Sequence, residues 1–217
     1  MRYNEDLLTL FLHALERMQD PFHGWERERK KKRMTEEAQE TRREEVARVR
    51  SYLASQSMRL TTAQLVETLR QAQQEFLAAV HAMPEALIRA TPRAGEWSAL
   101  DVILHMRTIA AMELSAFTSV LVHGVRPPDI RDMLTPASAE MTRENLLADL
   151  EGFRVQMIAL VSSVAEDAYL DITWSHPEFG AMHWREWLLF ARVHLLDHTR
   201  QVQAIAATLA QERRVDA

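Results

Sequence analysis

The chain of 217 residues contains no cysteine, which excludes disulfide bonds, thiolate metal ligands and a cysteine nucleophile together. It also lacks any apolar stretch that approaches the roughly 20 residues needed to span a membrane. An apolar run does lie near the start, at 7–12, but Glu5 and Asp6 precede it, whereas a secretory signal begins with basic residues. We therefore expect a cytoplasmic protein that has no membrane partner.

Glycine is scarce, with five residues, and the seven prolines cluster with the glycines instead of interrupting the rest of the chain. Alanine, leucine, glutamate, glutamine and arginine fill the stretches between, and these residues are among the better helix formers. The formal net charge of -5 gives no overall reason to expect a nucleic-acid partner. The composition therefore indicates an all-α protein.

The later part of the chain divides into four long helices at its proline- and glycine-containing segments, and we predict these helices at about 62–82, 98–122, 142–164 and 184–212. Ser98 and Asp101 match an N-cap and its capping-box acid, and Thr142 matches the cap of the third helix. The segment 123–141 is a long connection, a loop precedes the last helix, and no β alternation is evident. Four helices with one long crossover are typical of a four-helix bundle.

The first part of the chain differs in composition, and we predict an N-terminal charged helical extension at 1–58 and the bundle at 59–217. Within the extension, the run Arg27 to Arg33 is strongly basic and holds all three lysines of the chain. It could bind phosphate groups, or it could form a solvated helix whose charges pair with the glutamates that follow. A narrow apolar stripe could dock this arm on the bundle or on a second subunit, and it consists of Val46, Val49, Tyr52 and Leu53.

Three of the nine histidines lie on the apolar stripes of predicted helices. His194 and His198 are four residues apart, so both imidazoles share one face of the last helix, and His105 has the same kind of position in the second. Polar rings in a core must be satisfied by hydrogen bonds or by a shared ion. A lone buried histidine is more often a hydrogen-bonded core residue, whereas three on facing helices of one bundle favour a metal site.

Two stretches resemble a known family. Trp97 to His105 reads Trp-Ser-Ala-Leu-Asp-Val-Ile-Leu-His, which resembles the second-helix signature of the DinB/YfiT-like superfamily. That signature has a tryptophan, then serine or threonine, an acid four residues after the tryptophan and a histidine four after the acid. The second stretch is similar to the superfamily's last loop and helix, and it comprises His176 to Gly180, Glu186, Trp187, His194, Asp197, His198 and Gln201.

The resemblance implies a four-helix bundle in which His105, His194 and His198 bind a divalent ion such as nickel, zinc or iron, often in a homodimer. It covers about residues 60–212. The family usually has glutamate where this chain has Asp101, and often serine or threonine near His183, so both positions depart from its pattern. His183 could cap the last helix or serve as a fourth ligand.

Three imidazole ligands leave coordination positions open for water or substrate, as catalytic zinc sites do. Such an ion can lower the pKa of bound water, bind a thiol as thiolate or polarise a carbonyl. The candidate carboxylates for orienting the imidazoles or moving protons are Asp197, Asp101 and Glu113. Glu113 could instead be a solvated or core-satisfied acid, and Asp197 could be an exposed helix acid. Gln201 could cover the rim of the site, and Trp97, Trp184 and Trp187 could line a pocket or simply pack.

The resemblance further implies a function, because some members of the superfamily resemble thiol-dependent transferases. Our first hypothesis is a metal-dependent enzyme that joins a low-molecular-weight thiol to a small electrophilic substrate. The alternatives are a metal-dependent hydrolase and a non-catalytic, stress-related metal-binding protein whose charged arm makes the contacts. Nucleic-acid binding through Arg27 to Arg33 ranks last, because the chain is net acidic and the run has no interleaved aromatic residues.

Overall fold

The computed structural model describes residues 36–129, 138 and 140–215. These residues form five α-helices, which are α3 (Glu36–Arg59), α4 (Thr62–Ala82), α5 (Ala99–Leu121), α6 (Arg143–Ser162) and α7 (Trp184–Val215). A 3-10 turn, η1 (Glu85–Leu87), follows α4, and two short strands, β1 (Thr173–His176) and β2 (Gly180–His183), precede α7. Residues 1–35 of the predicted extension, which include the basic run Arg27 to Arg33, lie outside the described residues.

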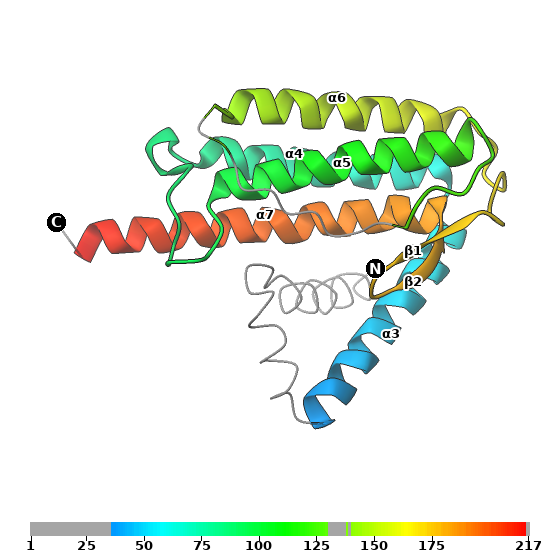
Figure 1. The fold of residues 1–217 in the computed structure, drawn as a ribbon, viewed down its shortest axis with the longest axis horizontal. Helices are drawn as coiled ribbons and strands as arrows, with labels where there is room; N and C mark the ends of the chain where they lie inside the picture. Colours follow the sequence, from blue (N-terminus) through cyan, green and yellow to red (C-terminus); the bar gives the residue numbers. More distant parts are fainter. Residues whose placement is uncertain (1–35, 130–137, 139, 216–217) are drawn as a thin grey trace.

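Helices α4 to α7 form a four-helix bundle, so the predicted fold class is confirmed (Figure 1). Helix α4 packs against α7 and α5 against α6. Helices α5 and α6 run in the same direction along the bundle (Figure 1), as a long crossover between them requires. No helix among the described residues is both long and apolar enough to cross a membrane.

The helix starts follow from side-chain caps that the sequence indicates. Ser98 accepts a hydrogen bond from the Asp101 amide, and the Asp101 carboxylate accepts one from the Ser98 amide, which makes the predicted capping box before α5. Thr142 caps α6 by accepting from the amide of Asn145. Each cap satisfies amide groups that the first helical turn leaves without partners, so these helices begin within one residue of the predicted positions.

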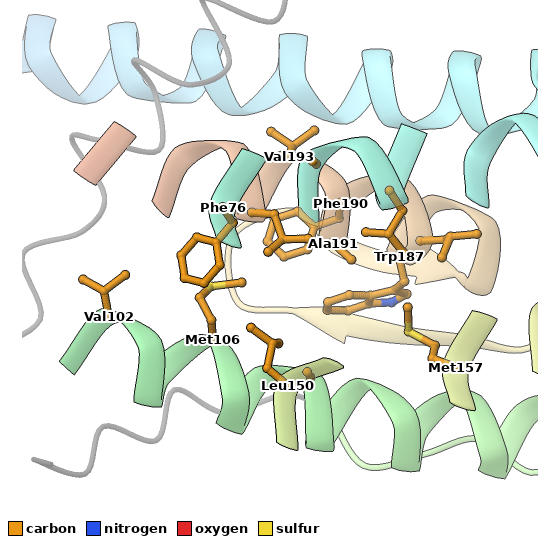
Figure 2. Close-up of a cluster of buried hydrophobic side chains, with 14 of the residues drawn as sticks. Phe76, Val102, Met106, Leu150, Met157, Trp187, Phe190, Ala191 and Val193 are labelled. Carbon is orange, nitrogen blue, oxygen red and sulfur yellow. The ribbon is translucent and has the colours of Figure 1, made fainter. Parts of the chain in front are cut away.

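The core lies along the axis of the bundle, where apolar residues at spacings of three and four from each helix meet. Figure 2 shows its central layer, in which Phe76 of α4, Met106 of α5 and Leu150 of α6 face Phe190 and Ala191 of α7. Trp187, one turn earlier on α7, extends the layer toward the β-hairpin. This packing fixes the relative rotation of α5 and α7, and therefore the direction of the histidines that they carry.

The antiparallel hairpin of β1 and β2 was not predicted, and its segment was expected to be a loop. Thr173 pairs with His183, and His176 pairs with Gly180 at the turn end. Gly180 has a φ of 70°, a conformation that glycine adopts without the steric cost of a Cβ. The strands have four residues each, too few for an alternating pattern to stand out in sequence.

Helix α3 docks on the bundle through the predicted apolar stripe. Val49, Tyr52 and Leu53 are buried in the same core as the bundle helices, and α3 packs against α7. Arg185 of α7 strengthens the contact by donating to the backbone carbonyl of Ser57 at 2.9 Å. Of the two predicted docking partners, the bundle of the same chain is therefore the one that receives the stripe. In Figure 1, α3 runs obliquely away from the bundle on the side of the hairpin.

Candidate metal centre

The three histidines predicted as ligands lie together between α5 and α7. His105 comes from α5, and His194 and His198 come from successive turns of α7. Residues four apart on a helix are separated by about 40° around its axis, so the two α7 imidazoles point the same way, toward His105. The ligand atoms of the three rings all lie within 4.8 Å of one another.

The Nε2 atoms of the three rings face a common point. His194 Nε2 lies 2.9 Å from His198 Nε2 and 3.4 Å from His105 Nε2. Nitrogens that share one ion at 2.0–2.1 Å lie roughly 2.9 to 3.4 Å apart when the bond angles are about 90° to 109°. These two separations therefore suit nitrogens that share one ion with octahedral or tetrahedral angles.

Gln201 determines which nitrogen of His198 is free. The Gln201 side-chain oxygen lies 2.8 Å from His198 Nδ1. Since an amide oxygen only accepts, Nδ1 carries the proton and Nε2 presents its lone pair to the other two rings. A partner of this kind fixes both the tautomer and the orientation of a metal-binding imidazole. The residue expected to cover the rim of the site thus contacts a predicted ligand directly.

Burial keeps these imidazoles neutral. It lowers the pKa of His105 to about 4. Burial also lowers the pKa of His194 and His198 well below the ordinary value, and neighbouring imidazoles lower both further. Neutral imidazole is the form that binds a metal ion, so the cluster is ready to bind one at neutral pH without first losing protons.

The cluster is poorly satisfied by protein groups alone. Among the described residues, Nδ1 of His105 and Nδ1 of His194 are buried without a hydrogen-bond partner. Three neutral rings that face one another can share at most a few N–H groups, and buried polar groups normally find partners. A cation at the common point would bind the three Nε2 lone pairs and leave the Nδ1 atoms unchanged, so it is the three-imidazole donor set that fits a divalent ion such as zinc, nickel or iron.

Aromatic rings enclose the cluster. Trp97, just before α5, lies 5.2 Å from the His105 ring and stacks on His198 at 6.3 Å, measured between ring centroids. Phe190 lies 5.4 Å from His194 on the other side. His198 is 1 % exposed, whereas His105 and His194 are half-buried. The site therefore has apolar walls, and His105 and His194 are the two rings of the cluster that are partly exposed.

The three candidate carboxylates occupy different places. Asp101 belongs to the capping box at the start of α5. Asp197 is buried on α7, about 60° around the helix from His194 and about 100° from His198, so it lies beside the histidine stripe. Glu113 forms a buried ion pair with Arg154 of α6. Burial raises the pKa of Glu113, and Arg154 opposes that shift.

The remaining predicted residues have structural contacts. His183 Nδ1 accepts from the Glu186 amide at 3.4 Å, and the Glu186 carboxylate accepts from the His183 amide at 3.0 Å. His183 therefore caps α7, the first of the two roles left open for it. Trp184 and Trp187 are buried and donate to the carbonyls of Ala168 and Trp174. Trp97 is the one of the three whose ring contacts the three-histidine cluster among the described residues.

Two residues near the site did not emerge from the sequence. Arg154 is fully buried and close enough for its charge to lower the pKa of His194. A lone arginine in a helix gives no sequence signal that it is buried, and the partner of Arg154, Glu113, is 41 positions away. His176 of β1 also lies within electrostatic reach of His194. It stood in the quoted family stretch, but its position depends on a hairpin that the sequence did not indicate.

Comparison with known proteins agrees with the fold. A family model described as the DinB superfamily matches residues 68–202, well over half of the chain. TT2238, described as a four-helix bundle protein, is similar in structure with a TM-score of 0.53 and 21% identity, over 66% of this chain and 99% of that one. At such identities, likeness between structures shows the fold alone.

A second solved structure is also similar. It is YfiT from Bacillus subtilis, described as "a probable metal-dependent hydrolase with an unusual four-helix bundle topology". The TM-score is 0.54 and the identity 18%, and the match covers 69% of this chain and 87% of that one. No curated protein matches the chain in sequence.

Proposed function

The chain belongs to the DinB superfamily, and from that premise we propose that it is a divalent-metal-dependent enzyme whose ion is held by His105, His194 and His198. The observation that carries the proposal is the convergence of three neutral imidazoles, with Nε2 separations of 2.9 and 3.4 Å, in a site with aromatic walls. Such a set leaves coordination positions open.

The surrounding residues support a reactive site more than a closed structural one. Gln201 holds His198 in the tautomer that presents Nε2 inward. Trp97 and Phe190 keep water from the sides of the cluster, and exclusion of water strengthens electrostatic interactions inside it. A divalent ion in this place would lower the pKa of a bound water or thiol and so supply a nucleophile at neutral pH.

The reaction that we propose first is transfer of a low-molecular-weight thiol to a small electrophile. A sulfur–carbon bond forms, the bond from that carbon to the leaving group breaks, and the thiol proton leaves with the leaving group or passes to solvent. Because the chain has no cysteine, the thiol must be a separate small molecule. Half-burial of His105 and His194 leaves an edge of the site from which that molecule can approach.

Hydrolysis by a metal-bound nucleophile from water is the second candidate. The likeness to YfiT, described as a probable metal-dependent hydrolase, favours it, and the same three imidazoles would serve. The two reactions differ in the nucleophile, because only the transferase requires an added thiol. A metal-binding protein without turnover is the remaining alternative.

The first test is the metal content of the purified protein beside His105→Ala and His198→Ala, with the exposed His123→Ala as the matched control. We expect about one equivalent in the parent and the control, and loss of the ion in both cluster variants. Absence of metal from the parent after incubation with zinc, nickel and iron would sink the proposal and leave three core histidines.

The second test separates the reactions. The loaded protein is assayed with a halodinitrobenzene and a panel of small thiols, and separately with esters and amides without thiol. Turnover that needs thiol and disappears in His194→Ala supports the transferase, and thiol-independent turnover with the same dependence supports the hydrolase. Stoichiometric metal with no turnover across both panels would leave the non-catalytic protein.

We also propose a cytoplasmic homodimer with an N-terminal extension that ends near residue 58. The bundle and the family match at 68–202 are compatible with that boundary. Sedimentation of the full chain tests the dimer, and a monomer at micromolar concentration would contradict it.

A further inference from the structure

His176 lies at the end of β1, where its ring is fixed by the hairpin turn. Its Nδ1 accepts hydrogen bonds from the amides of Glu178 at 3.1 Å and Phe179 at 3.4 Å. A nitrogen that accepts from two N–H groups uses its lone pair, so in the neutral ring the proton must sit on Nε2. The turn therefore determines the tautomer, and Nε2 carries a donor that points away from the turn.

Aromatic side chains hold the His176 ring beside the three-histidine cluster. The ring lies 4.9 Å from Phe190 and 5.7 Å from Trp187, measured between centroids. Phe190 in turn lies 5.4 Å from His194, so His176 and His194 pack on the same phenyl ring. A charge on His176 would lower the pKa of His194, which places the two rings within electrostatic reach.

No described residue accepts a hydrogen bond from the donor on Nε2. Within the described part of the chain, the hydrogen bonds of His176 are the two to Nδ1. The side chain is half-buried, so a bound molecule can reach it. Burial lowers the pKa of His176 to about 4, and the ring consequently donates at neutral pH without carrying a charge or losing its proton.

We propose that His176 Nε2 donates a hydrogen bond to an acceptor oxygen of the substrate held at the three-histidine site. The inference rests on the proposed function, because it requires a ligand at that site. It assigns the substrate class as a small molecule with a carboxylate or carbonyl oxygen a few atoms from its reacting group, with an apolar part that can lie against Phe190. The hairpin thus contributes a substrate-binding residue from outside the bundle.

Two small thiols provide the probe. Ethanethiol has only its sulfur, and mercaptoacetate adds a carboxylate beside it. Both are titrated into the cobalt(II)-loaded full chain, and the thiolate-to-cobalt absorption reports binding. The quantity of interest is the ratio of the two affinities, because that ratio reports how much the carboxylate contributes to binding.

Two substitutions divide the functions of the ring. His176→Asn keeps an oxygen acceptor for the turn amides and removes the distant donor. His176→Gln places an N–H near the position of Nε2 and loses the turn acceptor. We expect His176→Asn to weaken mercaptoacetate binding roughly tenfold, the affinity equivalent of one hydrogen bond to a charged acceptor, and to leave ethanethiol within about twofold. His176→Gln should keep most of the preference for mercaptoacetate.

The outcomes are distinguishable. An unchanged affinity ratio in His176→Asn, or an equal loss in both variants, would overturn the inference, because the ring would then act only as a wall or a turn closure. If His176→Asn does not take up cobalt, His176→Gln decides alone, and loss of the preference there overturns it. If the parent shows no cobalt bands, or if the same bands persist in His198→Ala, the proposed function itself is wrong.

Discussion

The interior of the bundle contains two clusters of polar side chains, the Glu113–Arg154 ion pair and the three-histidine cluster, and they are satisfied in different ways. Glu113 and Arg154 are 2 % and 0 % exposed, and their opposite charges are in contact. The histidines are neutral groups of one kind whose lone pairs face a common point. The two opposite charges of the ion pair compensate each other, although Oε1 of Glu113 and Nε and Nη2 of Arg154 have no hydrogen-bond partner among the described residues. The histidine cluster contains no negative or positive member, and its inward-facing lone pairs suit a cation.

We infer from this difference that the ion pair serves the fold and that the histidine cluster serves a ligand. Removing one member of a buried ion pair leaves a charge in a medium of low polarity, so neither member can be lost alone without destabilising the bundle. Removing one imidazole leaves no charge behind, so its cost in the metal-free protein does not include this electrostatic penalty. Glu113, predicted from sequence as a carboxylate near the metal, forms an ion pair with Arg154, and the Arg154 charge lowers the pKa of His194.

The largest expected effect comes from breaking the pair on its acidic side. Glu113→Gln leaves the Arg154 guanidinium buried and charged, since arginine does not lose its proton in proteins. We expect the free energy of unfolding to fall by about 3–5 kcal/mol, measured by urea denaturation of the metal-free protein. A loss below about 1 kcal/mol would mean that Arg154 reaches solvent or another partner.

The double variant Glu113→Leu with Arg154→Met is the matched control. It removes both charges and keeps an apolar volume, so it should be as stable as the parent or more stable by about 1–4 kcal/mol. Metal stoichiometry should stay at the parent value in this variant. Loss of metal from the double variant would show that the pair supports the histidine cluster and that the division between the two is wrong.

The next effect is stabilisation of the histidine cluster by an ion. A ligand that binds only the folded state, at a free concentration of 100 times its Kd, adds about 2.7 kcal/mol to the free energy of unfolding. We expect that increment with zinc in the parent and in the Glu113→Leu, Arg154→Met variant, and none in His198→Ala. Equal stabilisation of His198→Ala would place the zinc elsewhere.

The bundle and the three histidines were predictable because their signals are local or periodic. The cap at Ser98 and Asp101 is set by residues three apart, and it is confirmed. The positions of His105, His194 and His198 follow from helical periodicity once those helices are assigned. Such signals need no knowledge of which helices become neighbours.

The contacts that sequence reasoning missed depend on tertiary neighbours. Nothing near Glu113 in sequence indicates Arg154, because the partner comes from the next helix. The hairpin was missed because its strands have four residues, and with it the tautomer of His176, which two turn amides determine. The missed contacts are therefore the ion pair of Glu113 and the placement of His176 beside the histidine cluster.

The smallest expected effect is the pH dependence of stability in the metal-free protein. The histidine cluster is recognised by the direction of that dependence, because its buried neutral rings make the protein less stable as the pH falls. The pKa of His105 is near its ordinary value of 6.5 in the unfolded chain and about 4 in the folded one. Between these values the unfolded chain binds more protons, so stability is fully present above pH 6.5 and is lost as the pH falls toward 4. Each such histidine contributes up to about 1.4 kcal/mol per pH unit.

Urea denaturation at pH 7.5, 6 and 5 should therefore show that the free energy of unfolding falls steeply with acid in the parent and less steeply in His105→Gln. The exposed His123→Gln is expected to keep the parent slope, and an unchanged slope in His105→Gln would mean that the ring takes up its proton as readily in the folded protein as in the unfolded chain.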